Sequence, residues 1–386
     1  MNHSANNGVY YFLGNITSHV LHALPLYKQL GGTFVVTSKR AERELAHYQV
    51  PILRLDNINP FIQKEVSRLH ARLGLPGQEL LLNRAYQKTF RFLEENAKIV
   101  LFYELFEFTD YSRLSRPKTI FLTHGAMLKS YFTMYPKRLE IIKEYDFMAA
   151  MGPAIKRRII AEGVDPGKLL NIGIARTDEV LQKRVDKEEI KRQLLSILGL
   201  DDNQKLIAYL PTFWGPSSIY NTGKAIIENC PRDYVLLFRP HPQTPKKLLA
   251  EYARLIEQRS NVFYMPNHRS ESFGLLEILA CSELIIGDVS SVMLEAILLD
   301  TPLIFAFDKG EHRQPDADYA LIKDIVSHSQ KVDSQTAHLL PSIIKQALTA
   351  GIDKKIWNTT KDQIFYNYDG TSATAIAATI RRLAGL

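Results

Sequence analysis

The chain has 386 residues, more than one ordinary hydrophobic core accommodates, so its length favours two domains with a cleft between them. Its 48 lysines and arginines against 41 aspartates and glutamates give a net charge of +7, which suits an anionic substrate, an anionic membrane surface or a nucleic acid equally well. The two cysteines lie in apolar segments and argue against a disulfide or metal framework, and without a signal-peptide pattern or a run of about 18 apolar residues we expect a cytoplasmic protein, soluble or peripheral.

The chain opens with a strand–helix–strand pattern. The short apolar run GVYYFLGN is followed by SHVLHALPLYKQLGG, in which Val20, Leu21, Leu24 and Leu30 recur at helical spacing, and then by the second run TFVVTS. Further short apolar runs, each followed by a polar turn or a helical pattern, are KIVLFYEL, KTIFLTHG, DFMAAMG and KLLNIGI. The pattern predicts a parallel sheet covered by helices.

Residues 59–114 interrupt this pattern with helical segments that mix basic and apolar side chains. Such a segment is typical of a solvated helical face over a core, and the alternative is a face that rests on an anionic membrane. The basic residues concerned are Lys64, Arg68, Arg72, Arg84, Lys88 and Arg91.

A second α/β domain is predicted after the charged helical segment that follows GIARTD. The strand pattern restarts there with KLIAYLPT, DYVLLFRPHP, NVFYMP, LIIGDVSS and PLIFAF. We place the two domains at residues 1–172 and 173–362, and expect residues 363–386 to form a C-terminal helix that packs back on the first domain.

Functional residues are expected in the loops after the strands, because ligands of open parallel sheets bind at the carboxyl ends of the strands. In TIFLTHGAMLK, His124 either takes a proton from a hydroxyl or caps the next helix. In VLLFRPHPQ, Arg239 suits bidentate phosphate binding and His241 suits donation to a phosphate oxygen, and the two prolines stiffen the turn. The alternative is purely structural, because prolines commonly end a strand.

The stretch 287–306 breaks two apolar runs with an acid and two serines. Ser290 and Ser291 stand where a helix begins, so they predict an anion site, with a plain helix N-cap as the alternative. Asp288 precedes them at the strand end, and Glu295 is either a ligand for a hydroxyl-bearing group or an acid favoured by the helix dipole.

Two further loops carry candidate residues. Thr212 follows Pro211 at a strand end and either binds phosphate or caps a helix. Arg176 and Asp178, beside Gly173 at the domain junction, are more typical of a structural ion pair than of a site.

In their order and spacing, six motifs resemble the CDP-glycerol glycerophosphotransferase family, the teichoic-acid primases and polymerases. The motifs are THGAMLK, GIARTD, LPTFW, FRPHP, GDVSSVMLEAILLDTPLIF and YDGTSA. The resemblance implies the GT-B fold, in which two Rossmann-like α/β domains with parallel sheets face each other across a cleft. The sequence departs from the family pattern by reading HGAMLK for HGTPLK and DVSS for DYSS, and by lacking the arginine that often follows PTW.

The resemblance also implies an activity and a role for each matching residue. A polyol phosphate, with glycerol phosphate as the first choice, would pass from a CDP-activated donor to a hydroxyl of a lipid-linked saccharide or a growing cell-surface polymer, and CMP would be released. His124, beside Gly125 and Lys129, would be the base in an acceptor-side first domain, and His241 would act at the donor diphosphate in the second. The donor would be held by Pro211, Thr212, Arg239, Asp288, Ser290, Ser291 and Glu295, and the hinge would be formed by Gly173, Arg176 and Asp178.

The expected partners follow from this activity. They are the CDP-polyol, a polyprenyl-diphosphate-linked saccharide or polymer, and the anionic inner face of the cytoplasmic membrane, with no nucleic acid. Phosphoryl transfer requires positioning and charge neutralisation, which hydroxyls, helix N-termini, an arginine and histidines supply, so we expect no metal site and no required cofactor, although magnesium can accompany the donor diphosphate.

Two other functions compete with this hypothesis. A GT-B glycosyltransferase in capsule or lipopolysaccharide synthesis would use RPHP for the diphosphate of a sugar nucleotide equally well. A non-catalytic basic protein that binds nucleic acid or anionic lipid is disfavoured, because the basic residues are dispersed and no nucleic-acid-binding module is recognisable.

Overall fold

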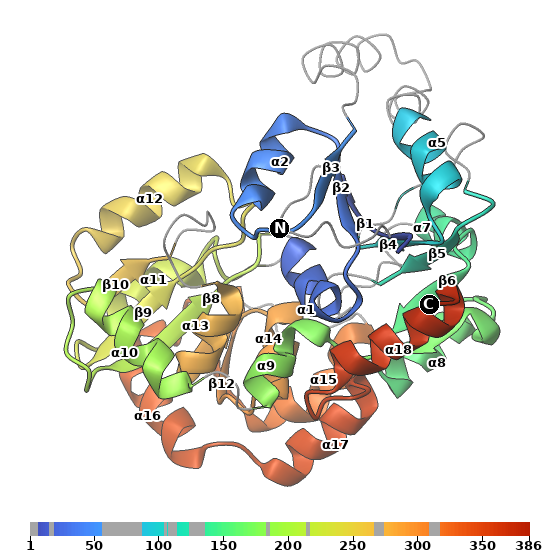
Figure 1. The fold of residues 1–386 in the computed structure, drawn as a ribbon. Coiled ribbons are helices and arrows are strands. Elements are labelled where there is room, and N and C mark those ends of the chain that lie inside the picture. Colours follow the sequence, from blue (N-terminus) through green and yellow to red (C-terminus); the bar gives the residue numbers. More distant parts are fainter. Residues whose placement is uncertain are drawn as a thin grey trace, which may run out of the picture. The chain divides into compact units, whose positions relative to one another are not determined.

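The computed structural model describes residues 7–14, 19–55, 87–103, 106, 114–122, 136–182, 186–213, 217–265, 274–308 and 317–386. The chain divides into two compact units (Figure 1). Unit 1 comprises Met1–His124, Tyr131–Arg176 and Thr371–Leu386, and unit 2 comprises Gly125–Ser130 and Thr177–Gly370.

In the described part of unit 1, seven parallel strands form a sheet in the order β3-β2-β1-β4-β5-β6-β7. The strands are β1 (Val9–Gly14), β2 (Thr33–Val36), β3 (Ile52–Arg54), β4 (Ile99–Phe102), β5 (Lys118–Phe121), β6 (Phe147–Ala150) and β7 (Leu169–Asn171). The helices are α1 (Val20–Leu30), α2 (Lys39–Ala46), α5 (Gln87–Asn96), α7 (Pro136–Lys143), α8 (Pro153–Ala161) and α18 (Ser372–Ala384), with short 3-10 turns η2 (Pro166–Lys168) and η3 (Ala175–Thr177).

The core of unit 1 lies between this sheet and its helices. β1 is buried along its whole length, as expected for a central strand of a sheet covered on both faces. The C-terminal helix α18 packs against α1 with Ala373, Ile376, Ala377 and Ile380 in the core, and the Arg381 guanidinium donates to the Gln29 carbonyl at 2.7 Å. The return from α1 to β2 needs glycine, because Gly32 has φ 108° and an added Cβ would lie 2.6 Å from the Val9 carbonyl oxygen.

In the described part of unit 2, six parallel strands form a sheet in the order β10-β9-β8-β11-β12-β13. The strands are β8 (Lys205–Leu210), β9 (Tyr234–Phe238), β10 (Val262–Tyr264), β11 (Leu284–Gly287), β12 (Leu303–Ala306) and β13 (Gln330–Val332). The helices are α9 (Asp178–Leu181), α10 (Lys187–Ile197), α11 (Thr222–Asn229), α12 (Lys246–Ile256), α13 (Leu275–Cys281), α14 (Ser291–Leu298), α15 (Ala317–His328), α16 (Leu340–Ala350) and α17 (Lys354–Ile364), with the 3-10 turn η4 (Ala337–Leu339).

Both sheets have the strand order of a Rossmann-like domain, which confirms the predicted fold class. The order reverses between β1 and β4 in unit 1 and between β8 and β11 in unit 2. These two places are the topological switch points, where open α/β sheets bind ligands. The sequence patterns missed only β3 and β13 among the described strands; each has three residues and forms one edge of its sheet.

The basic segment 59–114 is described in part. Lys88 and Arg91 are exposed on α5, whose Phe90 and Leu93 are buried, so this helix has the expected solvated face over a core. Lys64, Arg68, Arg72 and Arg84 lie outside the described residues.

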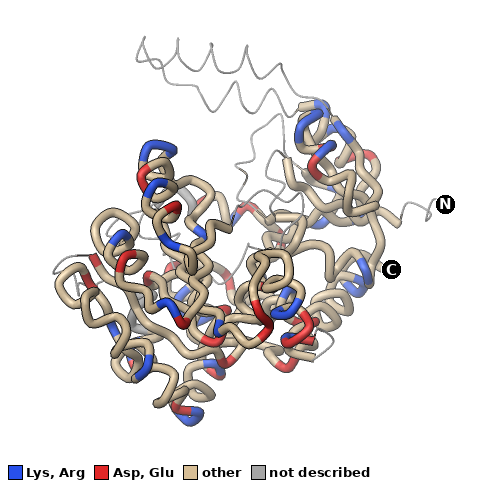
Figure 2. Tube along the Cα trace, turned by 90° about the vertical axis from the view of Figure 1, so that its left-hand side faces the viewer, with Lys and Arg blue, Asp and Glu red and all other residues tan. Residues whose placement is uncertain are grey.

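Charges of both signs are interspersed along the described trace of each unit (Figure 2). This distribution differs from the continuous basic stripe that is typical of nucleic-acid-binding surfaces. None of the described helices combines the length and the apolar character that a membrane span requires.

Candidate functional site

The switch point of unit 2 brings together residues from three of the motifs. β9, β8 and β11 are adjacent parallel strands, so their carboxyl ends lie at one edge of the sheet. Arg239 and His241 follow β9, Pro211 and Thr212 follow β8, and Asp288 follows β11.

Asp288 closes this edge with four hydrogen bonds. Its Oδ2 accepts from the Thr212 amide at 2.6 Å, the Thr212 hydroxyl at 3.0 Å and the Ser217 hydroxyl at 2.9 Å, and its Oδ1 accepts from the Ser218 amide at 2.8 Å. The Ser217 hydroxyl also lies 2.8 Å from the Thr212 carbonyl oxygen. All four residues are buried. We call this set, Asp288, Thr212, Ser217 and Ser218, the Asp288 lock.

The Asp288 lock changes the roles expected for two residues. Three of these donors reach Oδ2 and one reaches Oδ1, so most of the acceptor capacity of the Asp288 carboxylate is used within the protein. Asp288 thereby ties the loop after β8 to the end of β11. The hydroxyl hydrogen of Thr212 is likewise directed at Asp288, so Thr212 has no hydroxyl hydrogen left to donate to a phosphate.

Two buried tyrosines hold the next part of the loop. The Tyr209 hydroxyl lies 2.9 Å from the Ser218 hydroxyl, and the Tyr252 hydroxyl donates to the Ile219 carbonyl at 2.7 Å. Burial, followed by the proximity of negative groups that include Asp288, raises the pKa of both phenols, so both stay neutral hydroxyls at any physiological pH.

Arg239 and His241 flank the Asp288 lock on the β9 side. The Arg239 guanidinium is half-buried; burial lowers its pKa, while the charges of Glu277 and Tyr264 oppose this shift. An arginine stays charged under such a shift, because its ordinary pKa is far above neutral.

The imidazole of His241 is held in a defined orientation. Its ring stacks on Phe213 with centroids 4.3 Å apart and planes at 25°, and its Nδ1 accepts from the Gln243 amide at 3.2 Å. An accepting Nδ1 carries no hydrogen, so in the neutral ring the hydrogen lies on Nε2. Nε2 is therefore the atom that can donate to a phosphate oxygen.

The two serines begin α14, next to the Asp288 lock. Ser290 occupies the N-cap position, but its side chain makes no capping hydrogen bond, which removes the expected alternative of a plain side-chain cap for this residue. Its hydroxyl is buried and has no hydrogen-bond partner within the described part of the chain. Ser291 is half-buried as the first helical residue, and Glu295 is fully buried in the same helix. The helix N-terminus and the Ser290 hydroxyl together suit an anion.

The expected hinge residues lie where the chain passes from unit 1 to unit 2, between Arg176 and Thr177. Arg176 Nη1 lies 3.0 Å from the Nε2 of His22, a residue of α1 that the motifs did not single out. Asp178 is buried as the first residue of α9, and Gly173 is buried ahead of η3.

The acceptor-side candidates His124, Gly125 and Lys129 lie outside the described residues. Sequence reasoning also missed Phe213, Ser217 and Ser218. The only sequence feature that could have indicated them is their place in the loop after β8, because all three lie in PTFWGPSS.

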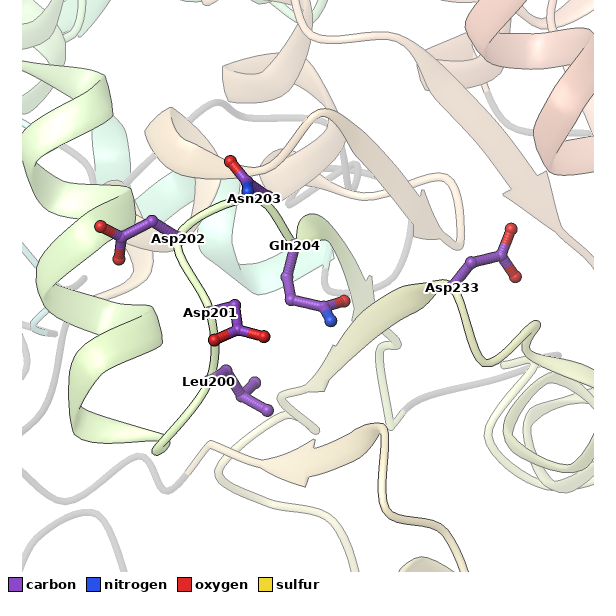
Figure 3. A pocket seen from close by; sticks show the side chains of 6 residues that line it. All are labelled: Leu200, Asp201, Asp202, Asn203, Gln204 and Asp233. Carbon is purple, nitrogen blue, oxygen red and sulfur yellow. The ribbon is translucent and has the colours of Figure 1, made fainter.

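A hollow of about 600 Å³ lies at the opposite edge of the same sheet (Figure 3). Leu200–Gln204 and Asp233 line it, just before β8 and β9 begin. In Figure 3 the carboxylates of Asp202 and Asp233 point away from each other. Among the described residues, no group of three or more His, Cys, Asp and Glu side chains is placed to hold a metal ion, here or at the switch point.

Comparison with known proteins decides the family. The sequence profile of the family described as CDP-Glycerol:Poly(glycerophosphate) glycerophosphotransferase matches residues 71–381. The chain belongs to this family. The resemblance inferred from the six motifs is thereby confirmed.

Two curated glycerophosphotransferases share part of the sequence. The teichoic acid glycerol-phosphate primase of Bacillus subtilis (strain 168) is 27% identical over 148 residues, which are 37% of this chain and 34% of the primase. The teichoic acid poly(glycerol phosphate) polymerase of Staphylococcus epidermidis is 31% identical over 157 residues, which are 38% of this chain and 20% of the polymerase. The matched segments thus span about a third or less of these relatives.

Solved structures share the fold of this glycerophosphotransferase family member. The wall teichoic acid polymerase TagF superposes with a TM-score of 0.64 over 98% of this chain and 89% of TagF, at 14% identity. The UDP-GlcNAc 2-epimerase of Neisseria meningitidis superposes with a TM-score of 0.61 over 97% of this chain and 99% of the epimerase, at 15% identity. At these identities the likeness concerns the fold alone.

Proposed function

We propose that the chain transfers glycerol phosphate from CDP-glycerol to a hydroxyl of a teichoic-acid-type polymer or of its lipid-linked saccharide primer, with release of CMP. The observation that carries the proposal is the switch point of unit 2. Three groups follow adjacent strands there: a charged Arg239, the Nε2 of His241, and the N-terminus of α14, where the Ser290 hydroxyl makes no capping hydrogen bond. These are the groups that a nucleoside diphosphate requires.

The chemistry assigns a task to each group. The acceptor oxygen attacks the phosphorus that carries the glycerol, the bond from that phosphorus to the bridging oxygen of CMP breaks, and the acceptor proton passes to His124. Arg239, His241 and the start of α14 would neutralise the charge that develops on the departing CMP. The Asp288 lock would hold these groups in place without contacting the donor.

Resident metal is not part of this proposal. The described carboxylates do not form a cluster suited to an ion, and Asp288 is occupied by Thr212, Ser217 and Ser218. Magnesium, where it takes part, would arrive on the donor diphosphate. Turnover in EDTA compared with turnover in added magnesium tests this point.

We further propose that the acceptor is presented at the inner face of the cytoplasmic membrane, with the chain bound peripherally. The net charge of +7 and the exposed Lys88 and Arg91 support attraction to anionic lipid. Co-sedimentation with anionic vesicles, compared with zwitterionic vesicles, measures that attraction.

The decisive experiment is calorimetric titration with CDP-glycerol, CDP-ribitol, CDP, UDP-N-acetylglucosamine and CMP-sialic acid, followed by an assay of CMP release. The proposal predicts binding of a CDP-polyol that is weakened about 10²-fold in Arg239→Ala and in His241→Ala, since each removes a charged or directed hydrogen bond to the diphosphate. Ser290→Ala should weaken donor binding with the fold intact. His124→Ala should lose turnover and retain donor binding.

Glycosyl transfer from a sugar nucleotide is the second candidate, because Arg239 and His241 of RPHP would serve the diphosphate of a sugar nucleotide equally well. Preference for UDP-N-acetylglucosamine or CMP-sialic acid in the same titration would support it and would overturn the CDP-polyol proposal.

A further inference from the structure

The loop after β8 places an aromatic ring against the candidate diphosphate histidine. Phe213 stacks on His241, although the two residues follow different strands. The motifs gave Phe213 no role, and the proposed function explains His241 without it. The Phe213 ring can orient His241 only if the Phe213 side chain is itself held in place.

The backbone is anchored on both sides of Phe213. On one side, Thr212 donates through its amide and hydroxyl to Asp288, and its carbonyl oxygen lies 2.8 Å from the Ser217 hydroxyl. On the other side, the Phe213 carbonyl accepts from the Tyr220 hydroxyl at 2.7 Å. An anchored backbone restricts the directions in which the side chain can point.

The far end of the loop is tied to the next strand of the sheet. The side-chain amide of Asn221 donates to both carboxylate oxygens of Asp308, at 2.7 and 2.8 Å, and the Thr222 hydroxyl donates to the Phe307 carbonyl at 2.6 Å. Phe307 and Asp308 directly follow β12. The described parts of the loop are thus fixed to the ends of β8, β11 and β12.

His241 receives its orientation from two directions. The Gln243 amide fixes Nδ1, and the Phe213 face restricts rotation of the ring plane. Stacking of this kind favours one relative orientation of two rings. With Nδ1 held by the Gln243 amide, Nε2 is the ring nitrogen that would donate to a phosphate oxygen.

We propose that Phe213 is a positioning residue for His241, and that the Asp288 lock acts on His241 through Phe213. This inference rests on the proposed function for its catalytic consequence, but the positioning itself is a property of the protein without substrate. Misplacement of a catalytic group by about 1 Å costs about 10²-fold in rate, which sets the size of the expected effect.

The first test needs no substrate. A proton stacked over an aromatic ring is shielded, so the His241 ring protons should resonate upfield in histidine-labelled protein, with the signal assigned by its loss in His241→Gln. Phe213→Leu should remove the upfield shift and Phe213→Tyr should retain it. An unmoved His241 signal in Phe213→Leu would overturn the proposal. Phe263→Leu, the same change at a half-buried position of β10, is the matched control and should leave the signal in place.

The second test is a double-mutant cycle on CMP release. Phe213→Leu should lower kcat about 10²-fold, and Phe213→Tyr should restore most of it. If Phe213 acts through His241, adding Phe213→Leu to His241→Ala should change kcat by less than about twofold. Effects that multiply in the double variant would mean that Phe213 acts independently of His241, and would overturn the proposal.

The Asp288 part has its own variants, because Asp288→Asn can prevent folding. Ser217→Ala removes one donor of the Asp288 lock and should shift the His241 signal in the same direction as Phe213→Leu, by a smaller amount. A His241 signal that is unchanged in Ser217→Ala and in folded Asp288→Asn would remove Asp288 from the proposal. A wild-type protein that releases no CMP from any CDP-polyol would refute the proposed function, while the resonance test would still decide the positioning.

Discussion

Replacement of Asp288 by alanine should destabilise unit 2 by about 3–5 kcal/mol. The substitution removes the acceptor of two buried amides, those of Thr212 and Ser218, and of two hydroxyls. Each buried amide left without a partner costs about 1–3 kcal/mol, whereas the hydroxyls can rotate toward other acceptors. The expected loss is therefore mainly that of the two amides together with the emptied volume.

Urea unfolding followed by tryptophan fluorescence measures this loss in unit 2 alone, since the two tryptophans, Trp214 and Trp357, both fall within its sequence range. A Trp214→Phe background leaves Trp357, buried in α17, as the reporter. With a slope of about 2 kcal/mol per molar urea, a loss of 4 kcal/mol moves the midpoint by about 2 M.

The matched control is Asp353→Ala. Asp353 also accepts from two amides, those of Lys355 and Ile356, but it is exposed as the N-cap of α17. Its loss should cost only about 1 kcal/mol, because water replaces the lost acceptor. A midpoint shift in Asp288→Ala no larger than that in Asp353→Ala would show that the buried Thr212 and Ser218 amides do not depend on Asp288.

Three further outcomes follow from described contacts. Gly223→Ala should lower the stability of unit 2 by about 1–3 kcal/mol in the same urea assay, because a Cβ would collide with the two tyrosine hydroxyls that hold the loop; an unchanged midpoint would contradict this packing. Cys230 and Cys281 should resist Ellman's reagent in native protein and react after denaturation, because burial raises the pKa of each thiol to about 12; rapid reaction of folded protein would contradict their burial. Burial alone would raise the pKa of Glu94, but hydrogen bonds from Ser115 and Arg116 outweigh burial and lower the pKa in the folded protein. Ionised Glu94 therefore stabilises unit 1 at pH values above its ordinary pKa of 4.5, and this contribution is lost as the pH falls through the lower pKa of the folded state. Glu94→Gln should therefore narrow the stability difference between pH 7 and pH 3, measured by circular dichroism, and an identical pH dependence in the variant would refute the assignment.

The fold could be predicted because the central strands carry its signal. β1, β4, β8 and β11 are buried along nearly their whole length, and such strands appear in a sequence as short continuous apolar runs. β3 and β13 give no such signal, because an edge strand packs against one neighbour and tolerates polar residues such as Gln330 and Lys331.

The site could be predicted only to the level of its loops. The rule that ligands gather at carboxyl ends of strands selected Thr212, Arg239, His241 and Asp288, which follow three adjacent strands of one sheet. It could not separate ligand-facing groups from groups that hold the loop. That distinction depends on hydrogen-bond partners, and Asp288 finds its partners 70–76 positions away in the sequence.

Ser290 carried two expectations, an anion site and a plain helix N-cap, between which the sequence does not decide. Serine at the start of a helix is a common side-chain cap, so sequence statistics favour a capping hydroxyl. In the structure the extended backbone of Ser290, with φ −155° and ψ 167°, starts α14 without that bond. A buried hydroxyl that does not cap its own helix can instead serve a ligand, which is a feature that no propensity scale reveals.

The departures from the family pattern leave the Asp288 lock intact. Its hydrogen bonds use the side chains of Asp288, Thr212 and Ser217 and two amides, so valine in DVSS, where many members have tyrosine, removes none of them. The arginine that often follows PTW would come after Thr212 in the sequence, so its absence also removes none of these bonds. Phe213, the residue after Thr212, stacks on His241. The proposed diphosphate end of the site is thus built from parts that any nucleotide donor would need. Selection of the polyol or sugar must rest on side chains outside the Asp288 lock, and for that reason a donor titration, rather than further mutation of Asp288, separates glycerol phosphate transfer from glycosyl transfer.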